Sequence, residues 1–333
     1  MESFQIIRES IKICLSYLYF SSACPPDYKS SPFAGLQRNA VLQESRIFHQ
    51  QIDPDRCVQV LTKILYLLSQ GEVFTKEEST ELFFACTKLF QSNNIYLRRM
   101  VYLVIKEICV DSDESLIVIS CLSKDMVGSQ DLFRANSIRV LCKIMDPSMM
   151  NNIERFLKQA VVDKNPFIVT STLLAGHHIY RHSPDVIRRW ANELLDAYNR
   201  PNPMVQFHAL SLMYRTKAND KVALAKTLSQ FARQPPTSAL ALTLHVRMVA
   251  KQVQNLPAPP ADLSSFLVAS LHSPHFAVQL EAARALAHMA NPPANGIAMA
   301  VATLQGLLQA SSVHKHAALR VLAHLSLSQP QAL

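Results

Sequence analysis

The segment Leu97-Arg-Arg-Met-Val-Tyr-Leu-Val-Ile-Lys-Glu-Ile108 carries the pattern that decides the fold class of this 333-residue chain. Its apolar residues stand at offsets 0, +4, +7, +8 and +11, which places them on one face of an α-helix. The same frame recurs at intervals of 36 or 37 residues, beginning at Phe133, Val169, Val205, Ala241, Val278 and His314. One helix of this kind cannot bury its apolar face alone, so neighbouring repeats must stack. We therefore predict an all-α fold, an α-solenoid of HEAT-like or armadillo-like helical pairs with a repeat of about 36 residues.

Polar residues followed by proline mark the expected helix starts. The polar residues of Asn165-Pro166, Asn202-Pro203 and Ser273-Pro274 precede frame residues by three to five positions, as an N-cap with proline at the first helical position would. Asp53-Pro54, Asp146-Pro147 and Ser183-Pro184 fall between frames and predict the starts of the partner helices. The frame weakens at Gly176-His177 and again at His245 and Gln252, where we expect irregular helices or an exposed surface. The favoured alternative is plain packing variation, which repeat arrays tolerate.

The composition favours a binding protein over an enzyme. The chain has only 6 glycines, and it contains no Gly-x-Gly-x-x-Gly, P-loop, His-Glu-x-x-His or Gly-x-Ser-x-Gly motif. No clustered acid and base pair stands out either. We predict no catalytic residues and no cofactor.

The cysteines and histidines do not form a metal-ligand pattern. The 7 cysteines include no Cys-x-x-Cys, and most lie within or beside helical frames, which is typical of small buried apolar residues in a reducing compartment. The groups His177/His178/His182 and His314/His316 have no carboxylate or thiolate at ligand spacing. We predict no metal site.

The net charge of +8 would suit an acidic partner, an acidic membrane or a nucleic acid. The basic residues are scattered, however, and pairs such as Arg98-Arg99 and Arg188-Arg189 indicate solvated helix faces. Aromatic residues do not alternate with them as a surface for stacking bases would require. We therefore predict no nucleic-acid partner.

The N-terminal residues differ from the rest of the chain. Residues 1–31 hold a short apolar run, too short to cross a membrane, and then a polar, proline-containing linker. We predict two parts: an atypical, poorly ordered segment at 1–31 and a helical-repeat trunk at 32–333.

Eight stretches of the trunk resemble the N-terminal trunk of the coatomer gamma-subunit family, which is related to the clathrin-adaptor large chains. The stretches are Ala40-Val-Leu-Gln-Glu-Ser-Arg46, Leu61-Thr-Lys-Ile-Leu-Tyr-Leu-Leu-Ser-Gln-Gly71, Phe83-Phe-Ala-Cys-Thr-Lys-Leu-Phe-Gln-Ser-Asn93, Leu97-Arg-Arg-Met-Val-Tyr-Leu-Val-Ile-Lys-Glu107, Ser123-Lys-Asp-Met126, Ala160-Val-Val-Asp-Lys164, Arg188-Arg-Trp-Ala-Asn-Glu193 and Met204-Val-Gln-Phe-His-Ala-Leu-Ser-Leu-Met-Tyr214. The resemblance runs from about Pro32 to the end and is densest up to Tyr214. Relative to the family, we expect a truncated trunk without the appendage domain.

The resemblance implies a non-catalytic structural subunit of the COPI vesicle coat, acting in Golgi-to-ER and intra-Golgi transport. It implies as partners the coatomer zeta subunit, the alpha, beta, beta-prime and delta subunits, and an Arf-type small GTPase in its GTP form. The implied location is cytoplasmic, peripheral on the cytosolic face of Golgi membranes and COPI vesicles. A contact that needs ordered GTPase switch loops would be lost when GTP is hydrolysed.

Similarity to the clathrin-adaptor large chains, aligned through Lys124-Asp125, places the GTPase contact on Leu116, Ile119 and Ser120 of one helix face, extended by residues 80–87. The alternative is that Leu116 and Ile119 are buried against the Leu97 helix, because apolar residues three apart on a helix usually belong to the core. Two other classes stay open, namely a HEAT-repeat scaffold or transport adaptor outside the COPI coat and a solenoid enzyme.

Overall fold

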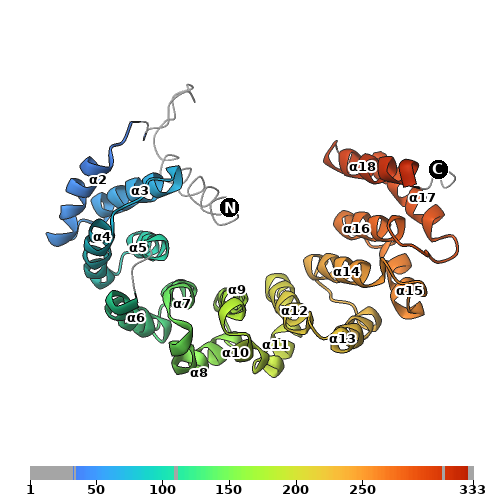
Figure 1. The fold of residues 1–333 in the computed structure, drawn as a ribbon, viewed down its shortest axis with the longest axis horizontal. Helices are drawn as coiled ribbons and strands as arrows, with labels where there is room; N and C mark the ends of the chain where they lie inside the picture. Colours follow the sequence, from blue (N-terminus) through green and yellow to red (C-terminus); the bar gives the residue numbers. More distant parts are fainter. Residues whose placement is uncertain (1–32, 34, 109–111, 310–311, 329–333) are drawn as a thin grey trace. The chain divides into compact units, whose positions relative to one another are not determined.

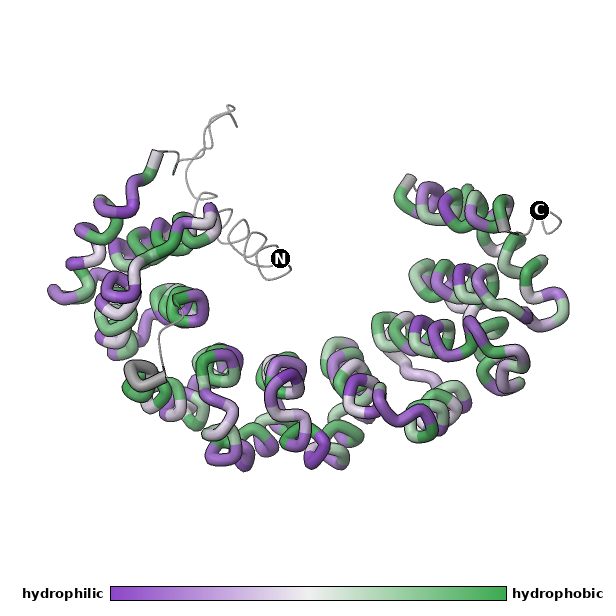
Figure 2. The backbone as a smooth tube through the Cα atoms, viewed as in Figure 1, coloured by the Kyte–Doolittle hydropathy of each residue, from purple (hydrophilic) through white to green (hydrophobic). Residues whose placement is uncertain are grey.

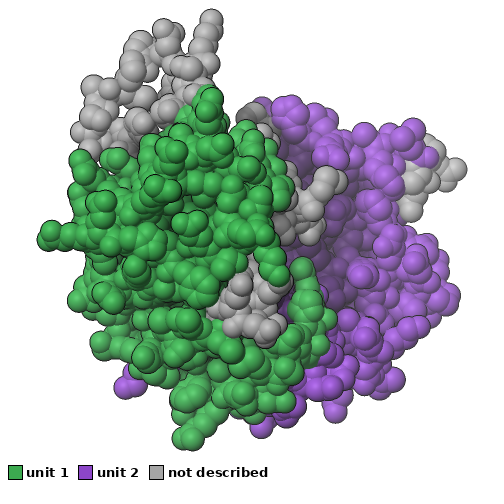
Figure 3. Space-filling view, turned by 60° about the vertical axis from the view of Figure 1, so that its left-hand side comes forward, with its two compact units in different colours: residues 1–160, 181–183 green, residues 161–180, 184–333 purple. Residues whose placement is uncertain are grey.

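The computed structural model describes residues 33, 35–108, 112–309 and 312–328, and all regular elements in these ranges are helices (Figure 1). The chain divides into two compact units, unit 1 with residues 1–160 and 181–183, and unit 2 with residues 161–180 and 184–333 (Figure 3). The predicted all-α fold is confirmed. The predicted N-terminal segment 1–31 lies outside the described residues.

The seven predicted frame helices are all present and form what we call the frame row of each unit. They are α5 (Ile95–Glu107), α7 (Asp131–Ile144), α9 (Pro166–His182), α12 (Pro203–Lys217), α14 (Ala239–Val253), α16 (Phe276–Ala287) and α18 (Ser312–Ser328). The first frame residue is the third or fourth residue of every one of these helices. Frame residues such as Leu97, Val205 and Val278 are fully buried. The 36-residue period therefore counts one frame helix and one partner region per repeat.

The helices between the frame helices form the partner row. They are α4 (Lys76–Lys88), α6 (Ser112–Met126), α8 (Met150–Val161), α10 (Pro184–Arg188), α11 (Ala191–Tyr198), α13 (Lys221–Arg233), α15 (Ala261–Ser270) and α17 (Gly296–Leu308). Frame helices pack on each other, α5 on α7 and α14 on α16, and partner helices pack on frame helices, α6 on α7 and α17 on α18. Figure 2 shows that hydrophilic and hydrophobic residues both occur along the helices.

The first elements of unit 1 are α2 (Arg38–Glu44), the 3-10 turn η1 (Ser45–His49) and α3 (Pro54–Gln70); further 3-10 turns are η2 (Leu89–Gln91) and η3 (Pro147–Met149). Pro54 does begin a helix, capped by the Asp53 side chain. The prediction that this is a partner helix is wrong, because α3 packs on α5 and so continues the frame row. Pro184 begins α10, but Pro147 begins η3, with α8 following at Met150.

The capping predictions hold for two of three frame helices. The Asn202 side chain accepts hydrogen bonds from the backbone N–H groups of Met204 and Val205, with Pro203 at the first helical position. Asn165 accepts from the backbone N–H of Phe167 at 2.9 Å. Ser273-Pro274 is displaced, because α16 begins only at Phe276 and its N-cap is His275, whose side chain makes no capping bond.

The frame is not irregular at either weak point, since α9 and α14 are continuous helices, and the alternative of plain packing variation fits both. At Gly176 a side chain would collide with the neighbouring frame helix, since an added Cβ would lie 2.7 Å from Leu212 Cδ2. The glycine is therefore a site of close packing. His245 is fully buried among aromatic rings and its Nδ1 shares a hydrogen bond with the Tyr214 hydroxyl.

Polar side chains tie equivalent positions of consecutive repeats together. Each of these hydrogen bonds ends on a main-chain carbonyl 34 to 38 residues away in the chain. In four of them the donor follows the acceptor along the chain: Lys143 donates to Lys106, Arg200 to Val162, Ser238 to Pro203 and Asn291 to Pro257. In the fifth, Arg38 donates to Val73, which lies later in the chain. Their sequence separation is close to the repeat period, so they hold neighbouring repeats in register.

Within the described ranges, no helix is long and apolar enough to cross a membrane. The same residues contain no group of three or more histidine, cysteine, aspartate or glutamate side chains that could hold a metal ion. Cys57, Cys86 and Cys142 are buried, and burial raises the pKa of the Cys86 and Cys142 thiols to about 12.

Candidate protein-binding surface on α4 and α6

The predicted GTPase-contacting residues lie on α6, and the structure separates them. Leu116 is 52% exposed and Ser120 is exposed, whereas Ile119 is only 8% exposed and belongs to the core. Leu116 and Ser120 are one helical turn apart and share the solvent face. The assignment of Ile119 to a contact surface is corrected, because a buried side chain in a packed core cannot reach a partner. The buried alternative holds for Ile119 alone, and α6 packs mainly on α7 rather than on α5.

Two further exposed apolar side chains lie on α6 and the neighbouring helix α4. Ile117 on α6 is 56% exposed and Phe84 on α4 is 36% exposed. The two helices pack against each other, so α4 is the neighbouring helix that was expected to extend the surface. We call Phe84, Leu116, Ile117 and Ser120 the α4–α6 face. Its exposed apolar residues, on helices whose other sides are buried, are typical of a protein-binding surface.

A capping box fixes the start of α4. The Thr75 side chain accepts from the backbone N–H of Glu78, and the Glu78 carboxylate accepts from the backbone N–H of Thr75. Arg38 donates to the Val73 carbonyl oxygen at 3.0 Å and pairs with Glu78 at 3.7 Å. These contacts anchor the N-terminal end of α4 to α2.

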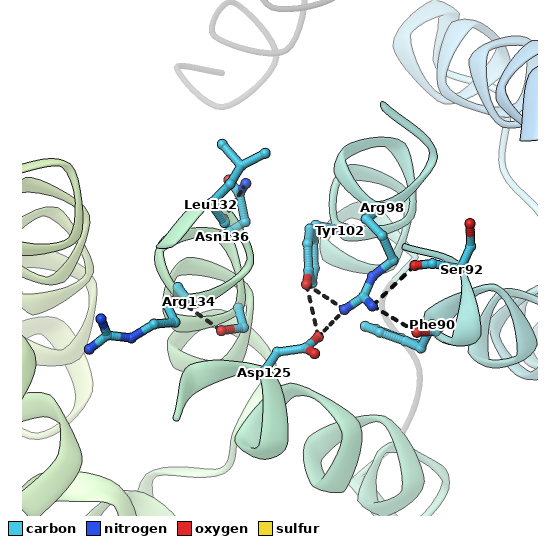
Figure 4. A network of polar contacts seen from close by, with 9 residues as sticks. Phe90, Ser92, Arg98, Tyr102, Asp125, Leu132, Arg134 and Asn136 are labelled. Carbon is cyan, nitrogen blue, oxygen red and sulfur yellow. Dashed lines mark hydrogen bonds and ion pairs between the residues drawn. The ribbon is translucent and has the colours of Figure 1, made fainter. Parts of the chain in front are cut away.

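A buried polar network fixes the C-terminal end of α6 (Figure 4). The Asp125 carboxylate, at the C-terminal end of α6, pairs with the Arg98 guanidinium of α5 and accepts a 2.8 Å hydrogen bond from the Tyr102 hydroxyl. Arg98 also donates to the Phe90 carbonyl oxygen at 2.7 Å. The guanidinium lies 4.4 Å from the centre of the Phe133 ring, a cation–π distance. The network joins η2, α5, α6 and α7.

Burial defines the electrostatics of this network. The side chains of Arg98 and Asp125 are 4% and 18% exposed, so the two charges are largely removed from water and compensate each other. Burial also raises the pKa of Tyr102, because it disfavours the phenolate, and the phenol therefore stays protonated and donates to Asp125. Arg134 of α7 adds a hydrogen bond to the Met126 carbonyl oxygen at the end of α6, 3.4 Å away.

The sequence pattern did not predict this network. Arg98-Arg99 was expected on a solvated face, but the whole Arg98 residue is 3% exposed. The available signal was the position of Arg98 directly after the frame residue Leu97, with Tyr102 four residues later and therefore on the same helix face. The carboxylate partner, 27 residues further along the chain, could be found only in the folded structure.

Comparisons with known proteins assign the chain to a family. The family described as Adaptin N terminal region matches residues 37–333. This chain therefore belongs to the adaptin N-terminal family of helical trunks.

Within that class the chain is similar to coatomer gamma subunits. It is 43% identical to coatomer subunit gamma-2 of Oryza sativa subsp. japonica over 309 residues, which is 91% of this chain and 35% of the relative. It is 42% identical to coatomer subunit gamma of Arabidopsis thaliana over the same shares, and 41% identical to coatomer subunit gamma-2 of Homo sapiens over 307 residues. The chain thus spans about a third of the length of these relatives. The resemblance predicted from the sequence is confirmed.

A solved structure of an engineered protein aligns with 86% of this chain at 16% identity and a TM-score of 0.44, which is too distant to support an argument.

Proposed function

We propose that this chain serves as the N-terminal trunk of a coatomer gamma subunit, a non-catalytic structural element of the COPI coat. The observation that carries the proposal is identity above 40% to coatomer gamma subunits over 91% of the chain. Work in this coat would place the protein on the cytosolic face of Golgi membranes and COPI vesicles. Its partners would be the zeta subunit and the other coatomer subunits.

We further propose that the α4–α6 face binds an Arf-type GTPase in its GTP form. Leu116 and Ser120 keep the role predicted for them, and Ile117 and Phe84 add exposed apolar surface. The capping box of α4 and the Arg98–Asp125 network support the proposal, because they hold both helices in place before a partner arrives.

A binding assay with matched variants tests this face. Leu116→Asp places a carboxylate at an exposed position, and its desolvation in an interface should weaken capture by GTP-loaded GTPase at least tenfold. Leu240→Asp, at a residue of α14 that is 50% exposed, makes the same chemical change elsewhere and should leave capture unchanged. Normal capture of a folded Leu116→Asp protein, or equal loss in both variants, would reject the α4–α6 face.

Co-purification separates the coat assignment from the alternative of a HEAT-repeat scaffold outside COPI. Residues 1–333 expressed with a zeta subunit should elute as one complex, and both substitutions should leave this complex intact. Failure to hold zeta, together with normal folding by circular dichroism, would favour the other class of scaffold.

A further inference from the structure

The frame helices of unit 2 carry a second periodic pattern, made of cations. In α14, α16 and α18, frame offset +6 is arginine and offset +10 is lysine or histidine. We call these six residues the basic ladder: Arg247 and Lys251, Arg284 and His288, Arg320 and His324. Offsets +6 and +10 are four residues apart, so the pairs on α14 and α18 each project from one face of their helix, while His288 is the C-cap of α16.

The contacts between the helices show that the basic ladder is continuous. Arg247, Lys251, Arg284 and His288 line one cleft of about 270 Å³ between α14 and α16. The imidazole rings of His288 and His324 stack with their centres 4.1 Å apart, which joins α16 to α18. The side chains of Arg247 and Arg284 are 56% and 52% exposed, so both guanidinium groups can reach a ligand.

One buried carboxylate orders the two arginines. Glu281, with its side chain 10% exposed, accepts from Arg247 at 2.7 Å with one oxygen and from Arg284 at 2.6 Å with the other. A carboxylate that holds two guanidinium groups fixes their separation before a ligand binds. Four cationic side chains and this one carboxylate leave the basic ladder with a net charge of +3, with both histidines neutral.

The surrounding sequence adds almost no compensating acid. From Ala239 to Leu333, Asp262 and Glu281 are the only acidic residues. Helix α7 of unit 1 has Arg139 and Lys143 at the same two offsets, but there Lys143 pairs with Glu107 of α5 at 3.5 Å. In unit 2 the equivalent cations lie along a cleft, at a spacing set by the packing of the helices.

We propose that the basic ladder binds an extended acidic peptide segment of a protein, with acidic side chains at every third residue. Packed helices lie about 8–10 Å apart, so the arginines of successive helices should repeat at about that distance. A chain in the polyproline II conformation rises about 3.1 Å per residue with three residues per turn, so side chains three apart lie on one edge of the peptide at about that spacing. Side chains three apart would then meet Arg247, Arg284 and Arg320 in turn. A row of cationic side chains beside a cleft fits a linear ligand, and for this reason a peptide is favoured over a flat membrane surface.

The test measures binding of labelled peptides to the whole 333-residue chain by fluorescence anisotropy. One peptide carries four glutamates at every third position in a serine–glycine chain, and the other has the same composition with the four glutamates contiguous. The spaced peptide should bind at least fivefold more tightly, and its affinity should fall as salt is raised. Equal or tighter binding of the contiguous peptide would overturn the proposal, because non-specific attraction predicts that result.

Two double variants localise the site. Lys251→Gln with Arg320→Gln removes two exposed cations of the basic ladder without changing Glu281. This double variant should bind the spaced peptide about tenfold more weakly. Lys221→Gln with Lys226→Gln removes the same charge from exposed positions of α13 and should change binding less than twofold. Equal losses in both would show a net-charge effect and overturn the site. Binding to phosphatidylserine vesicles that depends on the basic ladder, without binding of either peptide, would replace the peptide with a lipid surface. The substitutions lie outside the α4–α6 face, so GTPase capture should be normal whatever the result.

Discussion

Removal of the Asp125 carboxylate should destabilise unit 1 by isolating a buried cation. In Asp125→Ala, the Arg98 guanidinium, 4% exposed as a side chain, loses its counter-ion and keeps only its carbonyl, hydroxyl and aromatic contacts. Breaking one side of a buried ion pair costs about 3–5 kcal/mol. We expect the lower end of that range, because Asp125 retains 18% exposure and water can partly solvate the site.

The assay is urea unfolding followed by circular dichroism. With a urea dependence of about 2–3 kcal/mol per M, a loss of about 3 kcal/mol should lower the midpoint of the affected transition by about 1 M. The control is Asp185→Ala, which removes a surface pair with Arg188 in which the side chains are 78% and 52% exposed, and its midpoint should not move measurably.

A third variant separates the burial of charge from the loss of contacts. Arg98→Met combined with Asp125→Leu removes both charges and should recover part of the stability lost in Asp125→Ala. Equal midpoints for Asp125→Ala and Asp185→Ala would refute the reasoning, because the pair would then contribute no more than an exposed one.

Three further predictions concern the frame row. Gly176→Ala should destabilise the fold despite the better helix propensity of alanine, because its Cβ would lie 2.7 Å from Cδ2 of Leu212, which is fully buried and has to shift within a packed core. Gly306→Ala, with nothing within 4 Å, should stabilise by about 0.5–1 kcal/mol, and thermal melts compare the two. Leu141→Ala, at a fully buried frame position, should cost about 2–4 kcal/mol in urea unfolding, and an unchanged midpoint would contradict the frame. Burial lowers the pKa of His245 from 6.5 to about 4, so between these pH values the unfolded chain binds a proton that the folded chain does not. The free energy of unfolding should therefore fall by up to about 3 kcal/mol as pH falls from 6.5 to 4. His245→Phe should flatten this part of the pH profile of the urea midpoint.

The frame row could be predicted from the sequence because its signal is redundant. Seven helices repeat one apolar pattern, and each burial requirement is local to a helix and its neighbours. Exceptions such as Gly176 and His245 could not be interpreted in the same way. A glycine in a weak frame and a glycine at a close contact have the same sequence, and only the position of Leu212 distinguishes them.

The binding surface was less predictable than the fold. Leu116 and Ile119 are both apolar and three residues apart, yet one is half exposed and the other buried. The edge of a buried stripe depends on how a helix is rotated against its neighbours, and hydrophobicity alone does not fix that rotation. Asp125 contributes to this rotation through Arg98, a partner 27 residues away that no local pattern identifies.

The hydrogen bonds between repeats constrain the residue type of the donor but not that of the acceptor. In each of them a side chain of one repeat binds a main-chain carbonyl of another, as Asn291 binds Pro257 and Arg200 binds Val162. Every residue type has a carbonyl, so only the donor position needs a particular side chain. A repeat can therefore change its loop sequence freely and still be recognised by its neighbour. Chimeras that exchange whole repeats between related trunks should keep their register if they retain the donors, whatever residues supply the acceptors.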